Sequence, residues 1–270
     1  MRKLRGALVA ILAVGLIAPA ASPADPIQSI TAKLTPKKLP KKKYKPAKIY
    51  VEILTGPNGT GPNPEQPPSA YRTKVNFPKN MKFDTRKAKR CKGTEAQLQN
   101  TTTSQAKKVC GNKSIVSKGS KTPTGPEHTN GTSAWVTVDL PGDNSTLGVP
   151  VVVTAFNGTK KNQLFLHSRA DSVNNTSVLV GKLKKGPKGY GRTLDVKIPP
   201  LLAGAISRFT TTVKSGKYVQ ARCKSKNMKF QAVTWYDDHA TTKDDYGQKC
   251  KAKKGKKKHK KHHKHKHHRR

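Results

Sequence analysis

Short runs of alternating apolar and polar residues constrain the fold of this chain more than any other feature. In the run Lys48–Leu54, for example, Ile49, Val51 and Ile53 would share one face. This period of two is typical of β-strands with one buried face. Gly- and Pro-containing segments separate the runs, and the Asn157-Gly158 pair between two of them is a strong hairpin signal. The sequence therefore predicts many short antiparallel strands.

One short helix interrupts this pattern, at Thr102–Cys110. Thr102 can cap its N-terminus, and Gly111 stands where a C-terminal cap belongs. We therefore predict an all-β fold, an antiparallel β-sandwich of jelly-roll or immunoglobulin type with one short helix and disordered termini. Residues 47–250 would form this body, as one unit or as two parts divided near residues 121–131. Residues 25–46 would form a basic, proline-spaced N-terminal segment.

Residues 1–24 have the form of a secretory signal peptide. Basic residues precede the apolar run Ala7–Ala18, and small residues follow it. The run is shorter than the roughly 20 residues that a membrane-spanning helix needs. We therefore predict a secreted or cell-envelope-associated protein with no transmembrane span after cleavage, which fits after either Ala20 or Ala24.

Four cysteines, Cys91, Cys110, Cys223 and Cys250, belong to the predicted mature chain. An even number of cysteines in an exported protein indicates disulfide bonds. We favour Cys91–Cys110 and Cys223–Cys250, because the other pairings would bridge more than a hundred residues. A zinc site is the alternative, but no Cys-x-x-Cys spacing supports it.

Positive charge is spread over the whole chain. Residues 25–248 contain 39 Lys and Arg and all 14 Asp and Glu, an excess of 25 positive charges. Residues 249–270 add thirteen Lys and Arg and six His with no acid. Such a chain binds polyanions. For an exported protein we expect anionic cell-wall polymers, acidic polysaccharides or lipid head groups, and extracellular nucleic acid only without sequence preference.

The C-terminal segment 251–270 is too polar to bury a core, and we predict a disordered polycationic tail. Its expected polyanion-binding residues are Lys256, Lys257, Lys258, Lys260, Lys261, Lys264, Lys266, Arg269 and Arg270. Imidazoles at this density also bind transition metals adventitiously, with His262, His263, His265, His267 and His268 as the candidate ligands. Unperturbed histidine has a pKa near 6.5, so mild acid would increase the charge of the tail.

An acidic cluster interrupts the basic body. Asp237, Asp238, Asp244 and Asp245 lie within nine residues, beside His239. Calcium favours clustered oxygen ligands, so this acidic cluster is a candidate calcium site. The alternative interpretation is a solvated loop neutralised by neighbouring lysines. We expect no obligatory cofactor.

No catalytic signature is evident. The nucleophile motif GxSxG is absent. His167, Ser168 and Asp171 are the residue types of a catalytic triad, but they are sequence neighbours, whereas a triad is assembled by three-dimensional geometry. We interpret His167 as a strand residue at the sheet surface or rim, and the scattered carboxylates as ion-pair partners of lysines.

Four segments together resemble a group of uncharacterised secreted actinobacterial proteins. They are PKKLPKKKYKPAKIYVEI (36–53), AFNG (155–158), CKSKNMKFQAVTWYDD (223–238) and the Lys/His tail. The resemblance implies export and a β-rich body, and it implies no activity. We therefore expect a non-enzymatic envelope- or polyanion-associated protein. A carbohydrate-active or carbohydrate-binding module and an extracellular DNA binder are the alternatives.

Overall fold

The computed structural model describes residues 27–56, 67–119, 121–129, 131–139, 146–199, 204–213 and 216–253. Most of these residues are in strands, as the alternating pattern predicts. The strands are β1 Gln28–Thr35, β2 Lys38–Leu39, β3 Lys45–Pro46, β4 Lys48–Thr55, β5 Ala70–Pro78, β6 Met81–Phe83, β7 Ser133–Asp139, β8 Thr146–Asn157, β9 Gln163–Ala170, β10 Asn175–Lys185, β11 Tyr190–Lys197, β12 Gly204–Val213, β13 Val219–Ala221, β14 Asn227–Tyr236, β15 Thr241–Lys249 and β16 Lys251–Ala252.

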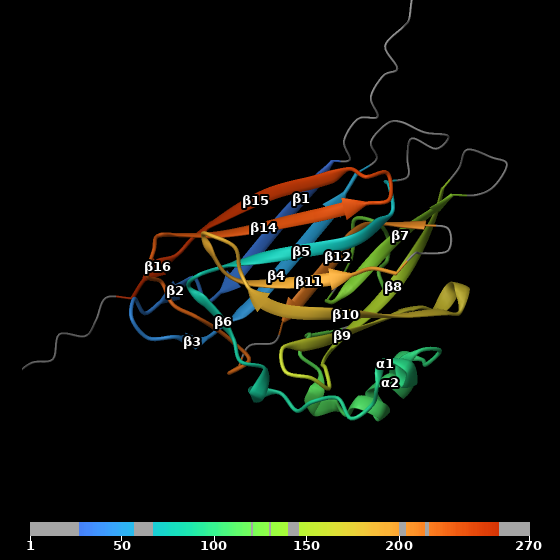
Figure 1. The fold of residues 1–270 in the computed structure, drawn as a ribbon, viewed down its shortest axis with the longest axis horizontal. Helices are drawn as coiled ribbons and strands as arrows, with labels where there is room; N and C mark the ends of the chain where they lie inside the picture. Colours follow the sequence, from blue (N-terminus) through green and yellow to red (C-terminus); the bar gives the residue numbers. More distant parts are fainter. Residues whose placement is uncertain are drawn as a thin grey trace, which may run out of the picture.

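Eleven of the strands form one antiparallel sheet, in the order β1-β4-β12-β7-β8-β9-β10-β11-β5-β14-β15. The all-β, antiparallel class is confirmed, but a sandwich of two sheets is not. The single sheet curls until its first and last strands meet, as Figure 1 shows. Strands that precede and strands that follow residues 121–131 belong to this one sheet, in which β5 lies between β11 and β14. Strand β1 is also part of it, so the sheet begins at Gln28 rather than at residue 47.

Side chains close the seam between β1 and β15. The Ile30 amide donates to Asp244 Oδ2 at 2.7 Å, and the Leu34 amide donates to Gln248 Oε1 at 2.6 Å. Gln248 Nε2 returns a bond to the Leu34 carbonyl at 3.2 Å. These contacts keep a constant sequence offset of 214 residues, so the two strands run parallel. Strand β15 therefore satisfies buried backbone groups of β1 without a backbone ladder.

Two helices cover part of the outer face, where one was predicted. The helix α2 (Thr103–Cys110) has the predicted Thr102 cap and ends at Gly111, and the single-turn helix α1 (Glu95–Leu98) precedes it. Both have a capping box, which satisfies the first free amides of each helix. The helices pack on β8, β9 and β10. After α2, Asn112–Ser114 forms a short 3-10 turn, and Ile115 and Ser117 form isolated bridges to β8 and β12.

The hydrophobic core lies inside the curled sheet. Alternate residues of the strands point inward, such as Ile49 and Val51 of β4, Val75 of β5 and Phe230 of β14. A second, smaller cluster lies outside the wall, under the helices. It contains Leu98, Ala106, Phe156, Phe165 and Val178 together with the Cys91 and Cys110 sulfurs.

Candidate functional site

The two ends of the curled sheet differ in charge. At one end, which we call the cationic end, the short connections between strands are segments 36–47, 158–162, 186–189, 222–226 and 250–253. These segments contain fourteen Lys and Arg and no Asp or Glu, whereas the long β6–β7 connection, which starts at the same end, includes Asp84, Glu95 and Glu127. The described segments at the other end are residue 56 and residues 67–69, 171–174, 198–199 and 237–240, and they contain no Lys or Arg and three Asp. Among the short connecting segments, the basic charge is therefore concentrated at one end.

The opposite end exposes apolar side chains, and we call it the apolar end. Among the described residues, the exposed large hydrophobic side chains are Ile27, Leu54, Tyr71, Leu147 and Val173. Each lies where β1, β4, β5, β8 or the β9–β10 connection reaches this end of the sheet. Figure 1 shows the separation, with β2, β3, β6 and β16 at the cationic end and the β9–β10 connection at the opposite end.

A groove of about 680 Å³ opens at the cationic end. Five basic side chains line this cationic groove, namely Lys79, Lys82, Arg86, Lys161 and Arg192. Its only carboxylate among the described residues is Asp84, and Arg86 binds it at 3.0 Å. This ion pair holds the pKa of Asp84 below its usual value. No described carboxylate forms an ion pair with the other four cations. They remain available to an anionic ligand.

Tyr44 organises the cations at the edge of this groove. The Lys82 ammonium lies 4.2 Å from the centre of the Tyr44 ring, and the Arg222 guanidinium lies 4.6 Å from it. Such cation–π contacts hold a charged head in place without neutralising it. The Tyr44 hydroxyl donates to the Lys79 carbonyl at 3.3 Å. Tyr44 thus connects the N-terminal basic segment to the groove.

Residues 36–46 of the predicted basic, proline-spaced N-terminal segment, which we call the basic segment 36–46, are folded onto the body. Strand β3 pairs with β13, and β2 pairs in parallel with β16. The Cys223 amide donates to the Pro40 carbonyl at 2.9 Å, and Arg222 Nη1 donates to the Lys42 carbonyl at 3.3 Å. Lys41, Lys42 and Lys43 are exposed. Their charge is therefore held beside the groove.

The last described residues also lie at the cationic end. The Lys253 amide donates to the Leu39 carbonyl at 2.9 Å, directly beside the basic segment. Segment 254–270 follows from this point. It contains the predicted polyanion-binding residues from Lys256 to Arg270 and the candidate metal ligands His262, His263, His265, His267 and His268, all of which lie outside the described residues.

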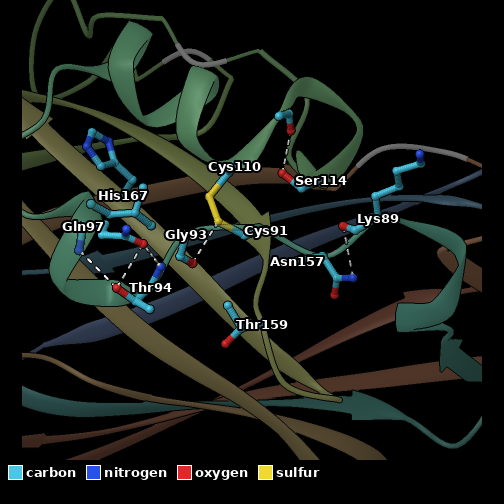
Figure 2. The surroundings of a disulfide bond; sticks show 12 residues. Lys89, Cys91, Gly93, Thr94, Gln97, Cys110, Ser114, Asn157, Thr159 and His167 are labelled. Carbon is cyan, nitrogen blue, oxygen red and sulfur yellow. Dashed lines mark hydrogen bonds between the residues drawn. A yellow bond between two sulfur atoms is a disulfide. The ribbon is translucent and has the colours of Figure 1, made fainter.

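The two predicted disulfides are confirmed. Cys223–Cys250 joins the end of β15 to the segment before β14, at the cationic end. Cys91–Cys110, shown in Figure 2, joins the start of the helical segment to the end of α2. The Cys91 amide donates to the Asn157 carbonyl at 2.8 Å. The disulfide Cys91–Cys110 thus holds the helices to the wall, and Cys223–Cys250, the second along the chain, holds the basic segments together.

The structure does not bring the carboxylates of the acidic cluster together. Asp244 faces β1 across the seam, whereas its neighbour Asp245 faces outward. Asp245 accepts from Gln231 Nε2 at 2.8 Å and from the Tyr190 hydroxyl at 3.0 Å. Burial and this carboxylate raise the pKa of Tyr190 to about 12. Asp237 and Asp238 lie in the exposed β14–β15 turn. Within the described residues, no group of three His, Cys, Asp or Glu side chains could hold a metal ion.

The segment of the acidic cluster is therefore partly a strand, not the solvated loop considered from the sequence. Trp235 of this segment makes cation–π contacts, since the Arg72 guanidinium lies 5.4 Å and the Lys74 ammonium 4.8 Å from its ring centre. The Arg72 guanidinium also donates two hydrogen bonds to the Asp195 carboxylate, at 2.8 and 2.9 Å. Lys184 binds the same carboxylate at 2.8 Å. The Arg72 and Lys184 hydrogen bonds hold the pKa of Asp195 well below its usual range.

His167 is a buried link between the wall and the helices. Its Nε2 lies 3.0 Å from the Thr101 hydroxyl and 3.1 Å from the Thr101 carbonyl. Burial lowers the pKa of His167, and the side chain is completely buried rather than at a surface or rim (Figure 2). Ser168 lines the interior, and Asp171 binds Arg169 at 2.8 Å. These neighbours do not form a triad.

No family model, curated protein or solved structure matches the chain. The resemblance to secreted actinobacterial proteins therefore stays a prediction. Among the described residues, no helix has the length and apolar character needed to cross a bilayer. Sequence reasoning found the basic segment and the tail. It missed Tyr44, Lys79, Lys82 and Arg192 as a group, because lysine is common throughout the chain and only the fold brings these residues together.

Proposed function

We propose that this chain is an exported, non-enzymatic protein that binds extracellular polyanions with its cationic end. The concentration of fourteen Lys and Arg in the connecting segments of one end is the observation that supports it most directly. A uniformly basic surface would have no preferred orientation toward an anionic partner. This protein instead presents an oriented cationic face, which suits an extended anionic surface such as a cell-wall polymer, an acidic polysaccharide or a lipid head-group layer.

Affinity in this proposal is distributed over many weak contacts. Each Lys or Arg near an anionic surface contributes on the order of 1 kcal/mol. The groove, the basic segment 36–46 and the tail that begins beside it would act together, and multivalent contact of this kind increases the overall affinity. Export itself rests on the N-terminal signal and is supported by the two disulfides, which persist in oxidising compartments.

The test is a salt titration of binding to heparin, a soluble acidic polysaccharide. Three proteins would be compared: the mature wild type, the groove variant Lys82→Gln/Arg192→Gln and the wall variant Lys197→Gln/Lys243→Gln. The two variants have the same net charge, and the two wall lysines are exposed on strands away from the cationic end. We expect the groove variant to lose roughly thirtyfold in affinity at low salt, from about 1 kcal/mol for each cation. The wall variant should lose less than threefold.

Equal losses in the two variants would refute an oriented binding face. Deletion of 254–270 measures the contribution of the tail, and unchanged binding and salt dependence would remove the tail from the proposal. Duplex DNA, anionic vesicles and a neutral glycan in the same assay distinguish the alternatives. Tight, salt-independent binding to the neutral glycan would favour a carbohydrate-binding module.

A further inference from the structure

The interior of the curled sheet contains two apolar cavities. The first has a volume of about 130 Å³ and the second about 270 Å³. They share the wall residues Leu166, Leu179, Ile198, Ile206 and Phe209, so they adjoin each other. Protein interiors normally contain few voids larger than a water molecule. Apolar cavities of roughly 150 Å³ stay dry and take up small apolar molecules such as benzene. The interior thus has the volume and the chemistry of a ligand site.

One polar group in the first cavity has no partner. Tyr218 is 93 % buried, its ring lines this cavity, and its hydroxyl forms no hydrogen bond with any described residue. Its ring packs edge-on against Phe83, with centroids 6.4 Å apart. Burial raises the pKa of the phenol, so the hydroxyl stays protonated and can donate. An unpaired buried donor is costly, and an acceptor on a bound molecule would satisfy it.

Other polar side chains of the first cavity have hydrogen-bond partners within the protein, as Thr211 does with Thr132. Gln28 Nε2 donates to the Thr234 hydroxyl, and the Thr73 and Thr234 hydroxyls lie 3.1 Å apart. The Gln28 carbonyl oxygen accepts from Thr242 at 3.0 Å. Of the described residues with a buried, unpartnered side-chain atom, Tyr218 is the one that lines this cavity. The interior therefore offers one free donor in an apolar environment.

The second cavity leads toward the apolar end. Leu147 and Val173 line it and are 47 % and 52 % exposed. Ile27, Leu54 and Tyr71 expose further apolar surface at the same end. The described connecting segments there contain no Lys or Arg. An apolar molecule would therefore meet a compatible surface before it reaches the interior.

We propose that the curled sheet binds an uncharged, predominantly apolar small molecule, which enters from the apolar end, occupies the first cavity and accepts a hydrogen bond from the Tyr218 hydroxyl, next to β13 at the far end of that cavity. A carbonyl or ether oxygen on a ring or chain meets this requirement. The cavity shares one lining residue, Phe83, with the cationic groove and none of its cations, so this proposal does not depend on polyanion binding.

Fluorescence titration of the mature protein with two neutral probes tests the proposal. Prodan has a naphthalene ring with a carbonyl acceptor, and N-phenyl-1-naphthylamine is of similar size without a carbonyl. Neither probe is charged, so the cationic surface does not attract them. We expect saturable binding of both. The variant Tyr218→Phe should weaken Prodan binding about fivefold, the value of one hydrogen bond, and leave N-phenyl-1-naphthylamine within twofold.

A second variant pair tests the location of the site. Leu179→Phe adds volume where the two cavities meet, whereas Lys243→Phe places the same aromatic side chain at an exposed position on the outer face of β15. The first should weaken both probes at least tenfold, and the second should leave both unchanged. If Leu179→Phe does not fold, the Tyr218→Phe comparison still decides, because it adds no volume. Absence of saturable binding to the wild type would overturn the proposal. It would also be overturned by equal effects of Tyr218→Phe on the two probes, or by full binding in folded Leu179→Phe.

Discussion

The two ends of the curled sheet differ in the length and chemistry of the segments that connect the strands. At the cationic end, long segments fold back over the sheet and are secured by small strands and a disulfide. At the apolar end, the described connections are short and display apolar side chains and carboxylates. The difference teaches that the high net charge of this chain is directional, and that the chemistry of each end can be changed without the other.

The cavity inside the sheet lowers the stability of the protein. An unfilled apolar cavity destabilises a protein by about 24 cal/mol per Å³, so 130 Å³ corresponds to about 3 kcal/mol. The cationic end instead gathers like charges that repel one another. A polyanion would relieve that repulsion, and an apolar ligand would fill the interior cavity. The cationic end and the interior therefore each stabilise the fold when their own class of ligand is bound.

The largest expected effect comes from moving charge between the ends. Lys82→Glu/Arg192→Glu changes the net charge by four units at the cationic end, and we expect heparin affinity at low salt to fall about a thousandfold. Asp237→Lys/Asp238→Lys changes the net charge by the same four units at the apolar end and should raise affinity less than threefold. Equal and opposite effects in this binding assay would show that net charge, rather than its location, governs binding.

Removal of the second disulfide should affect one end alone. We expect Cys223→Ala/Cys250→Ala to lower the free energy of unfolding by about 3 kcal/mol, because the crosslink constrains the unfolded chain. Urea denaturation under non-reducing conditions measures this loss. Heparin affinity should fall as well, since the disulfide fixes the segments beside Pro40 and Lys253. Unchanged heparin affinity would separate the disulfide from the binding face.

Asp195 on the wall between the ends should have an intermediate effect. Its carboxylate accepts from Arg72 and Lys184, so Asp195→Asn should cost about 2 kcal/mol of unfolding free energy at pH 7. The pKa of Asp195 is lowered by folding, so the carboxylate stabilises the protein above its ordinary pKa. That contribution is lost as the pH falls below about 4. Denaturation curves from pH 7 to pH 3 should be flatter for the variant, and parallel curves would contradict the assignment.

The smallest effect concerns His167 beneath the helices. Because burial lowers the pKa of His167, the unfolded chain takes up a proton more readily than the folded chain. Stability should therefore decrease as the pH falls below about 6.5. His167→Gln should remove that part of the decrease between pH 7.5 and pH 5.5, measured by urea denaturation. A variant with the same pH dependence as the wild type would exclude His167 as its source.

The sequence predicted the strands that obey alternation and the disulfide pairing. It missed β15, because Thr242, Asp244 and Gln248 of this strand do not bury apolar surface. They bond β1 and its side chains instead, and that role exists only when the sheet curls. A local pattern of polar residues cannot reveal a partner 214 residues away. For this reason the sequence predicted a calcium site or a solvated loop for the acidic cluster.

The candidate sites were less predictable than the fold. Basic segment 36–46 was visible as a charge run, but its attachment depends on β13 and β16. The groove is formed by residues of β6 and β11 and by residues that follow β5 or precede β9. They have no sequence signal of their own, because lysine is common throughout the chain. The unpaired hydroxyl of Tyr218 has no sequence signal, because the absence of a partner is a property of the tertiary structure.

The parallel seam also has a consequence for biogenesis. Eleven antiparallel strands are an odd number, so the first and last must run in the same direction when the sheet curls. They come from opposite parts of the chain, and the second disulfide follows β15 directly. A chain exported from its N-terminus would have β1 waiting unpaired on one side until β15 emerged. We therefore expect the closure of the sheet to be a late, slow step of folding, during which a strand-binding chaperone would find β1 accessible.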